Sequence, residues 1–358
     1  MTVYGNRLNN IRRKMASTVI DAVLVTKRVN YMYLSGFTGT AAILFISRER
    51  AVLLTDFRYV EQAAMQAPDY EIIRYVSDQF GEINKLLESE RIKRLAFEDC
   101  HLSYKLYMEY SEKLKTDGFV PLGGMIEGLR CIKDQTEIGL IRKAVDIADE
   151  VFTHILGFIK PGTTELDIAD EIEHYMKRLG AEGPSFETIV ASGKRASMPH
   201  GVASEKKLEH GDVVTLDYGA IYKGYCSDIT RTIFIGKPDE ELEKIYGIVL
   251  EANRKGLEAV KSGILAKEAD QAARDFIKEA GYDDNFGHGL GHGVGLEIHE
   301  DPTLSFMSDM VLKDGMVVTV EPGIYVPDLG GVRIEDMVVV NGDNALVLTK
   351  SPKEPIVL

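Results

Sequence analysis

Two aspartates interrupt apolar segments that are expected to form neighbouring β-strands. Asp217 lies in the expected strand 212–218, and Asp228 lies in the expected strand 224–235. Aspartate is depleted in strands, so two such positions are unusual. A tight turn at 222–223, or one nearby helped by the next glycine, would place the two residues opposite each other, with Cβ atoms about 4.5–5.5 Å apart. Carboxylates this close repel each other unless a cation lies between them, whereas two unrelated aspartates on an exposed hairpin would need no cation.

Two glutamates occupy comparable positions further along the chain. Glu321 directly follows the apolar segment 316–320 and precedes a Pro-Gly pair. Glu335 lies in the expected strand 332–340, where alternation places it on the same face as Arg333. Acidic residues that end or interrupt apolar strands point towards a buried site. Charged strand ends at the surface would give the same pattern.

Histidines are concentrated beside these acidic positions. His288, His292 and His299 are three of the eight histidines in the chain, and glycines flank them. Glycine lets the backbone approach another group closely and leaves room around the imidazoles. One such histidine would more often be structural, but three beside two acidic pairs favour metal ligation. His200, in the turn-like segment 197–201, is placed to reach the same site.

This combination of residue types indicates a pair of divalent cations. Four carboxylates and one imidazole suit Mn²⁺, Co²⁺ or Fe²⁺ in an open, oxygen-rich site better than they suit a closed thiolate zinc centre. Four negative charges balance two dications. Such ions lie about 3.5–4 Å apart, share a bridging hydroxide and catalyse hydrolysis. A dinuclear phosphoesterase would also use such a cluster, but it would more often add histidine and asparagine ligands.

Other catalytic and nucleotide-binding motifs do not fit the sequence. Glycine occurs at every second position over 287–295, but no dinucleotide-binding register fits, because residues 292 and 294 are His and Val. The chain also lacks a phosphate-binding loop of the GxxxxGK type, a GxSxG elbow and an HExxH motif. These absences argue against nucleotide binding and serine hydrolase chemistry.

The elements that must position these residues fall into two groups. Short apolar segments and helical patterns alternate over roughly the first 125 residues, which predicts a small mixed sheet covered by helices. The breaker cluster 121–124 is a candidate boundary, so we expect domains at 1–124 and 125–358. In the first group the expected strands are 22–26, 41–46 and 51–55, and the expected helices are 78–89 and 104–114.

The second group has a different order of elements. Helices come first, then strands, then a helix pair and further strands, which indicates an α+β domain rather than a regular βαβ alternation. Thr164 is the expected N-cap of one helix. The expected helices are 134–159, 164–179, 240–260 and 267–280, and the expected strands are 212–218, 224–235, 316–320 and 332–340.

Composition excludes several classes of function. The chain has 358 residues and a formal net charge of −14, which argues against nucleic acid or an anionic membrane as the main partner. No apolar segment reaches the roughly 18 residues that a membrane span needs, and no ordinary signal peptide is seen. The three cysteines are widely separated. This spacing excludes a disulfide framework and indicates a reducing cytoplasm.

The order of the acidic residues and histidines resembles that of the pita-bread metallopeptidases, which include methionine aminopeptidase, aminopeptidase P and prolidase. The motifs that carry the resemblance are 216–220, 227–231, 288–299, 320–325 and 332–336. Segments 30–36 and 54–59 resemble the N-terminal domain of the aminopeptidase P and prolidase branch. The resemblance implies an α+β fold, with a C-terminal pita-bread (creatinase/aminopeptidase) domain after a smaller α/β creatinase-type domain. Creatinase shares this fold but not the metal ligands.

The resemblance also implies a role for each matching residue. Glu321 would bind metal and act as a proton shuttle, while Glu335 would bind both metals. The implied metal ligands are Asp217, Asp228, His292, Glu321 and Glu335. The implied catalytic residues are His200, His299 and Glu321, and the implied substrate-binding residues are His288, Tyr325 and Arg333.

The implied activity is hydrolysis of the Xaa-Pro peptide bond by a dinuclear metal centre. An Xaa-Pro dipeptidase (prolidase) is the main hypothesis, and an aminopeptidase P that acts on longer peptides is the alternative. A non-catalytic pita-bread binding protein would have lost ligands, and none is lost here. The family further implies two divalent ions, most often Mn²⁺ with Co²⁺, Fe²⁺ or Zn²⁺ as alternatives, together with peptide substrates that carry proline second. It also implies a homodimer. The cysteine usage indicates the cytoplasm, and the acidic charge argues against nucleic acid or membrane partners.

Overall fold

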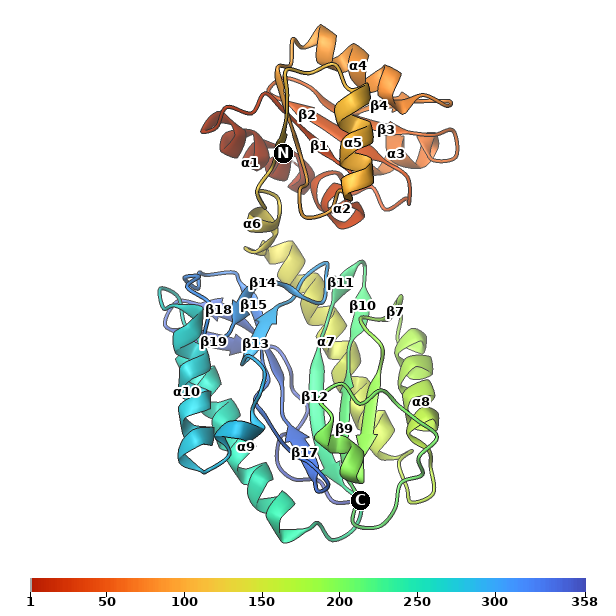
Figure 1. The fold of residues 1–358 in the computed structure, drawn as a ribbon. Helices are drawn as coiled ribbons and strands as arrows, with labels where there is room; N and C mark the ends of the chain where they lie inside the picture. The colour runs from red at the N-terminus through yellow and green to blue at the C-terminus, as the bar shows by residue number, and fades with distance from the viewer. Residues whose placement is uncertain (1) are drawn as a thin grey trace. The chain divides into compact units, whose positions relative to one another are not determined.

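The computed structural model describes residues 2–358. The chain divides into two compact units, Met1–Arg130 and Cys131–Leu358 (Figure 1). The sequence suggested a division after Gly124, at the breaker cluster. None of the helices in the described residues is long and apolar enough to cross a membrane.

The first unit is built on a six-stranded mixed sheet in the order β4-β3-β2-β1-β5-β6. Strands β1 to β3 are antiparallel, whereas β4, β5 and β6 join by parallel pairing. The small mixed sheet expected from the sequence is therefore present. Its strands are β1 (Ala22–Val25), β2 (Ile43–Ser47), β3 (Ala51–Thr55), β4 (Glu71–Arg74), β5 (Arg94–Phe97) and β6 (Gly118–Pro121). Its helices are α1 (Val3–Ala16), α2 (Arg28–Ser35), α3 (Val60–Gln66), α4 (Gln79–Ser89), α5 (Tyr104–Lys113) and α6 (Glu127–Arg130).

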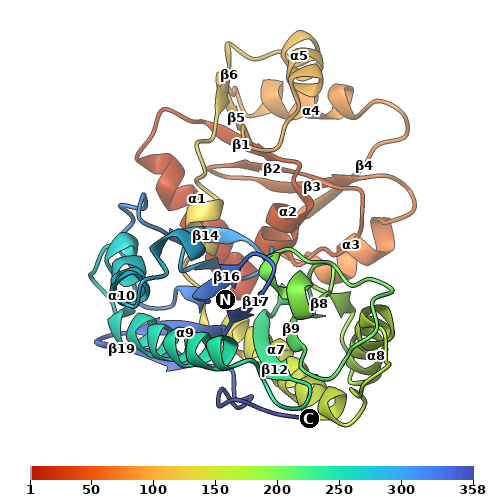
Figure 2. The same ribbon diagram turned by 60° about the horizontal axis from the view of Figure 1, so that its bottom comes forward.

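The second unit contains two helix pairs and the strands between them. Helices α7 and α8 pack on β8, β9 and β12, while α9 and α10 pack on β15, β17 and β18. Figures 1 and 2 show α9 and α10 on one side of these strands and α8 on the other. The helices are α7 (Gln135–Leu156), α8 (Glu165–Arg178), α9 (Glu240–Ala259) and α10 (Ala266–Glu279), with short 3₁₀ turns η1 (Gly193–Ser197) and η2 (Asp283–Asn285). Thr164 caps α8 as expected, since its hydroxyl accepts the Asp167 N–H.

The strands of the second unit form four small sheets. Their bounds are β7 (Gly183–Pro184), β8 (Ile189–Ser192), β9 (Val213–Tyr218), β10 (Ala220–Tyr222), β11 (Tyr225–Cys226), β12 (Ile229–Phe234), β13 (Gly291–Gly293), β14 (Glu300–Leu304), β15 (Val317–Val320), β16 (Gly323–Val326), β17 (Gly330–Arg333), β18 (Asp336–Asn341) and β19 (Asn344–Val347). The sheet orders are β11-β10-β7, β12-β9-β8, β14-β13-β15-β18-β19 and β16-β17.

The register of the hairpin that follows β9 differs from the expected one. Its two-residue turn is at Lys223 and Gly224, which both have positive φ (48° and 80°) as a type I′ turn requires. The turn therefore falls one residue later than 222–223. Asp217 consequently pairs with Thr230 rather than with Asp228. Asp228 precedes Thr230 by two residues, so the two aspartates are diagonal neighbours on one face.

Two of the expected strands are interrupted at the residues of interest. The segment 224–235 breaks between β11 and β12, where Asp228 lies, and 332–340 breaks between β17 and β18, where Glu335 lies. Glu321 occupies a similar gap after β15. Where the backbone leaves the hydrogen-bonded strands, it can direct a carboxylate away from the apolar core. The three breaks do this for Asp228, Glu321 and Glu335.

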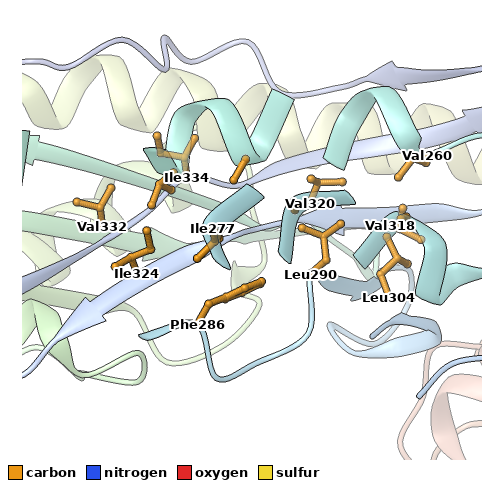
Figure 3. Packing of buried hydrophobic residues seen from close by; sticks show 14 of the residues in the cluster. Val260, Ile277, Phe286, Leu290, Leu304, Val318, Val320, Ile324, Val332 and Ile334 are labelled. Atoms are coloured by element: carbon orange, nitrogen blue, oxygen red, sulfur yellow. The ribbon is translucent and has the colours of Figure 1, made fainter. Parts of the chain in front are cut away.

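A core of aliphatic side chains lies beneath Glu321 and Glu335. Figure 3 shows Leu290, Val318 and Val320 among the packed residues. A Cβ on Gly256 of α9 would lie 2.8 Å from Val320 and 3.2 Å from Leu290, so the helix lies very close to β15. Leu290 O accepts the Glu321 N–H at 2.8 Å. The apolar packing thus fixes the backbone from which Glu321 projects.

A buried ion pair joins β12 to β18. Arg231 and Asp336 are each 1% exposed, and Arg231 Nη2 lies 2.9 Å from Asp336 Oδ1. The guanidinium also donates to the carbonyl oxygens of Ser351 and Pro352, and Lys353 Nζ lies 2.7 Å from Asp336 Oδ2. The C-terminal segment is therefore tied to the two strands that flank Asp228 and Glu335.

Replacing Arg231 with leucine should lower the free energy of unfolding of the second unit by about 3–5 kcal/mol, because Asp336 would lose its main buried partner. Urea denaturation of the full chain measures the change. The matched control is Arg254→Leu, whose guanidinium is 51% exposed in its pair with Glu251. That change should cost at most about 1 kcal/mol. Equal destabilisation by the two substitutions would contradict the prediction.

Candidate metal centre and substrate pocket

The second unit contains a cavity of about 870 Å³. Every site residue predicted from the sequence lines it, although these residues come from many separate elements. They are Asp217, Asp228, His292, Glu321, Glu335, His200, His299, His288, Tyr325 and Arg333. The fold therefore gathers the complete predicted set into one place.

The centre of the cavity is a cluster of carboxylates around one imidazole. Asp228, His292 and Glu335 each offer an atom within 4.8 Å of the others, as a metal site requires. His292 Nε2 lies 3.6 Å from Asp228 Oδ2 and 3.3 Å from Glu321 Oε1. Four of the predicted metal ligands thus surround a single small volume.

Asp217 joins the cluster through Arg333 and Thr230. Arg333 Nη2 lies 2.5 Å from Asp217 Oδ2, and Arg333 Nε donates to Thr230 Oγ1 at 3.0 Å. Thr230 Oγ1 in turn donates to Glu335 Oε2 at 2.7 Å. The threonine hydroxyl therefore orients Glu335 while the guanidinium holds Asp217.

The orientation of His292 suits metal binding. Its Nδ1 lies 3.1 Å from the Gly293 carbonyl oxygen, so a proton there leaves Nε2 directed at the carboxylates. Thr319 Oγ1 accepts the His292 N–H and donates to Glu321 Oε1, both at 3.0 Å. One hydroxyl on β15 thereby sets the spacing between His292 and Glu321.

Close backbone contacts at glycines hold β13 against its neighbours. A Cβ on Gly291 would lie 2.1 Å from the Thr319 carbonyl oxygen, and one on Gly293 would lie 2.3 Å from the Asp301 carbonyl oxygen. Neither space would admit a side chain. The glycine-rich pattern beside His292 is therefore a packing requirement, as the sequence suggested.

The cluster carries more negative charge than its protein surroundings neutralise. Burial, and then the neighbouring carboxylates, raise the pKa of Asp228 and of Glu335 well above their usual values. Burial also raises the pKa of Asp217, although Arg333 opposes this. Among residues 2–358, Glu335 Oε1 is buried without a hydrogen-bond partner. An orphaned oxygen within an oxygen-rich cluster fits hard divalent cations.

The pKa values of His292 and Glu321 shift differently from those of the other cluster residues, because these two side chains pair with each other. Burial disfavours charge on both, but their hydrogen bond and mutual attraction outweigh it. The pKa of Glu321 is lowered and that of His292 is raised. The pairing therefore favours opposite charges on the two side chains.

The remaining histidines lie around this cluster. His288 Nε2 lies 2.9 Å from the Tyr325 hydroxyl, which accepts a hydrogen bond from Arg333 Nη1 at 2.8 Å. The His299 ring centroid lies 4.3 Å from that of His292. Burial lowers the pKa of His288 and of His299. His200 is exposed at the cavity, beside Pro199, whose carbonyl oxygen accepts from Arg333.

The comparison with known families agrees with this geometry. Residues 139–342 match the model of metallopeptidase family M24, and residues 7–132 match that of the creatinase/prolidase N-terminal domain. The chain belongs to metallopeptidase family M24. The resemblance seen in the sequence and the α+β fold with a creatinase-type N-terminal domain are thereby confirmed. An M24 peptidase depends on divalent metal ions, and the carboxylate–histidine cluster is a fitting place for them.

Known relatives and solved structures align with nearly the whole of this chain. The Xaa-Pro dipeptidase of Pyrococcus furiosus is 43% identical over 350 residues, which are 97% of this chain and 99% of that protein. The structure of the Xaa-Pro dipeptidase from Bacillus anthracis is 49% identical, with a TM-score of 0.97 over 99% of this chain and 100% of that one. The X-Pro aminopeptidase structure from Thermotoga maritima is 39% identical, with a TM-score of 0.91 over 98% and 99% of the two chains.

Sequence reasoning missed several residues that support the M24 site. The buried Asn253 of α9 donates from Nδ2 to Val320 O at 3.0 Å and to Ile334 O at 3.2 Å. These are the carbonyl groups that directly precede Glu321 and Glu335, so one amide supports both strand breaks. A single asparagine in a helix gives no sequence signal of this kind. Apolar residues of the cavity wall were also missed, because they come from separate segments: Phe186, Ile189, Val202, Ile298 and Met307.

The substitution Gly291→Ala should lower the affinity of the M24 peptidase for Mn²⁺ by about 10–100-fold, because it forces β13 away from Thr319 and displaces His292. Calorimetric titration of chelator-treated protein with Mn²⁺ measures the affinity. Gly287→Ala is the matched control, since a Cβ at Gly287 meets no atom within 4 Å. If the two variants bind Mn²⁺ equally well, the close contact does not support the site.

Proposed function

We propose that this M24 peptidase is an Xaa-Pro dipeptidase. The observation that carries the proposal is the convergence of all five proposed metal ligands on one cavity, in a chain that aligns over nearly its whole length with relatives named Xaa-Pro dipeptidase. Similarity to an X-Pro aminopeptidase favours the second candidate, removal of the first residue from longer Xaa-Pro peptides. Both activities use the same residues and differ in how far the pocket extends beyond proline.

The proposed metal ligands are the members of the acidic cluster. Glu335 is a candidate for binding both ions, because one of its oxygens is held by Thr230 and the other is free of hydrogen bonds among the described residues. The others are Asp217, Asp228, His292 and Glu321. We propose two Mn²⁺ ions, with Co²⁺, Fe²⁺ and Zn²⁺ as alternatives, since carboxylate-rich sites suit these divalent cations.

The metal ions would supply a nucleophilic water near neutral pH and polarise the scissile carbonyl. Glu321 would accept a proton from the attacking water and return it to the leaving proline nitrogen. Thr319 holds its orientation through a hydrogen bond to Oε1. His200 and His299 would donate hydrogen bonds to the carbonyl oxygen as negative charge develops on it.

The proline side of the pocket is assigned to His288, Tyr325 and Arg333. The proline nitrogen of the scissile amide carries no hydrogen, so the pocket needs no acceptor for it. The substrate must instead be held by its ring and its carboxylate. The apolar wall suits the ring, while the guanidinium of Arg333 offers hydrogen-bond donors to a carboxylate and His288 packs beside Tyr325.

We further propose that the enzyme works as a cytoplasmic homodimer on small peptides. The dimer is inferred from the family, and the compartment is inferred from cysteine usage. Cys100, Cys131 and Cys226 form no disulfide among the described residues, as a reducing compartment would keep them. The net charge of −14 does not oppose a small zwitterionic substrate, because such a peptide carries no net charge itself.

Product analysis should reveal the activity. Chelator-stripped protein is expected to be inactive, and added Mn²⁺ or Co²⁺ is expected to restore release of alanine from Ala-Pro. Ala-Pro-Ala-Ala, tested in parallel, decides between the two candidates, since only an aminopeptidase P would release alanine from it. Cleavage of Met-Ala-Ser alone would instead indicate a methionine aminopeptidase. No cleavage of any peptide with any divalent metal would refute the proposal.

Replacement of Glu321 by glutamine should lower kcat on Ala-Pro by about 10²–10⁴-fold, because the proton shuttle is lost. Metal content is measured in the same samples by mass spectrometry, since Glu321 is also a proposed ligand. A variant that retains both metals and loses activity supports the shuttle. A variant with both metals and near-normal kcat would show that another group transfers the proton.

A further inference from the structure

His288 lies on a segment without regular secondary structure. This segment, 286–290, connects η2 to β13 and places His288 in the cavity wall. A loop of this kind needs support from elsewhere if its side chain is to keep a fixed position. Helix α10 provides that support.

Two residues of α10 form a buried ion pair beneath this segment. Arg274 Nε lies 2.8 Å from Asp270 Oδ2, and Arg274 Nη2 lies 2.9 Å from Asp270 Oδ1. The Asp270 side chain is 0% exposed and that of Arg274 is 17% exposed. Removing these charges from water is costly, so the pair must be compensated by further contacts.

The further hydrogen bonds of the pair are made to the segment that carries His288, and the guanidinium also lies 5.7 Å from the centroid of the Phe306 ring. Arg274 Nη1 donates to Phe286 O at 3.0 Å, and Nη2 donates to His288 O at 2.7 Å. Asp270 Oδ1 accepts the Leu290 N–H at 2.9 Å. The guanidinium also lies over the Phe286 ring, 4.3 Å from its centroid. The ion pair therefore forms hydrogen bonds with the backbone of every second residue of the segment, namely Phe286, His288 and Leu290.

The clamp reaches the metal cluster through side chains. Arg274 fixes the backbone of His288, whose ring contacts the Tyr325 hydroxyl. Arg333 donates to that hydroxyl and pairs with Asp217. Neither Asp270 nor Arg274 is among the residues that line the cavity. The hydrogen bonds of the pair therefore reach the cavity through the segment 286–290.

We propose that Asp270 and Arg274 are positioning residues that set the place of His288 and thereby the affinity for the proline side of the substrate. The inference rests on the proposed function, which places His288 against that part of the peptide. Arginine is required at 274, because its planar fork makes four hydrogen bonds in fixed directions. Lysine carries the same charge but cannot reproduce that geometry.

The test compares Arg274→Lys with the same substitution at Arg254 of α9. Arg254 pairs with Glu251 at the surface and does not line the cavity. With Mn²⁺ bound, Arg274→Lys should raise KM for Ala-Pro by about tenfold and lower kcat by less than about threefold, because uniform substrate binding is lost. Metal stoichiometry should stay at the wild-type value. Arg254→Lys should leave both constants near those of the wild type.

Several outcomes would overturn the proposal. Kinetics of Arg274→Lys that match those of Arg254→Lys would show that the clamp does not act on the substrate. Loss of metal, or a fall in kcat with unchanged KM, would show that it supports the metal cluster instead. If Arg274→Lys does not fold, Asp270→Asn serves in its place, since it keeps an acceptor for Leu290.

A second measurement distinguishes failure of the proposed peptidase activity from failure of the positioning role. If the wild-type protein does not cleave Ala-Pro, the clamp is judged by hydrogen exchange of the backbone amides at 286–290. Faster exchange in Arg274→Lys than in Arg254→Lys would support the positioning role. Equal exchange in the two variants would overturn it.

Discussion

Mutual repulsion between buried carboxylates is the constraint on which the rest of this structure depends. The acidic cluster holds its charges close together in a poorly solvated cavity, where such charges are expensive. Among the described residues, Arg333 supplies a positive charge beside Asp217, and the hydrogen bond with Glu321 raises the pKa of His292. The raised pKa values of Asp228 and Glu335 express the charge that is left uncompensated. Divalent ions resolve this imbalance, and the cost of assembling the cluster is the reason that it binds them.

Such a cluster can persist only if its backbone cannot relax. The strands end where the carboxylates are needed, and the freed carbonyl groups are satisfied from a neighbouring helix. Asn253 donates hydrogen bonds to the carbonyl groups that precede Glu321 and Glu335. Lys353 Nζ lies 2.9 Å from Oδ1 of Asn253. Lys353 also reaches Asp336, the partner of Arg231 in the buried pair. The strand breaks are therefore built into a network of satisfied polar groups, and they hold the repelling side chains in place.

The sequence was sufficient to identify the chemistry because the relevant residues contradict their surroundings. Asp217 within a strand and Glu335 in an apolar segment are visible as exceptions to local preference. The hairpin register was predicted wrongly by one residue, because the turn consists of Lys223 and Gly224, both at positive φ, while Tyr222 stays in the strand and pairs with Tyr225. Asn253 and Arg274 could not be found at all. Their partners lie in other elements, and a polar residue in a helix looks the same in sequence whether it faces solvent or a strand end.

The metal cluster and the substrate pocket are supported by different means. The predicted ligands lie on strands or at strand ends, whereas the other histidines of the cavity lie on or beside loops held by buried ion pairs. Glu165 is 0% exposed and binds Arg195 on the segment before His200. Lys133 and Glu300, 1% and 7% exposed, pair directly after His299. With Asp270 and Arg274 behind His288, each of these histidines has an ion pair outside the cavity. None of these paired residues lines the cavity, so each pair acts on the site through the segment that carries its histidine.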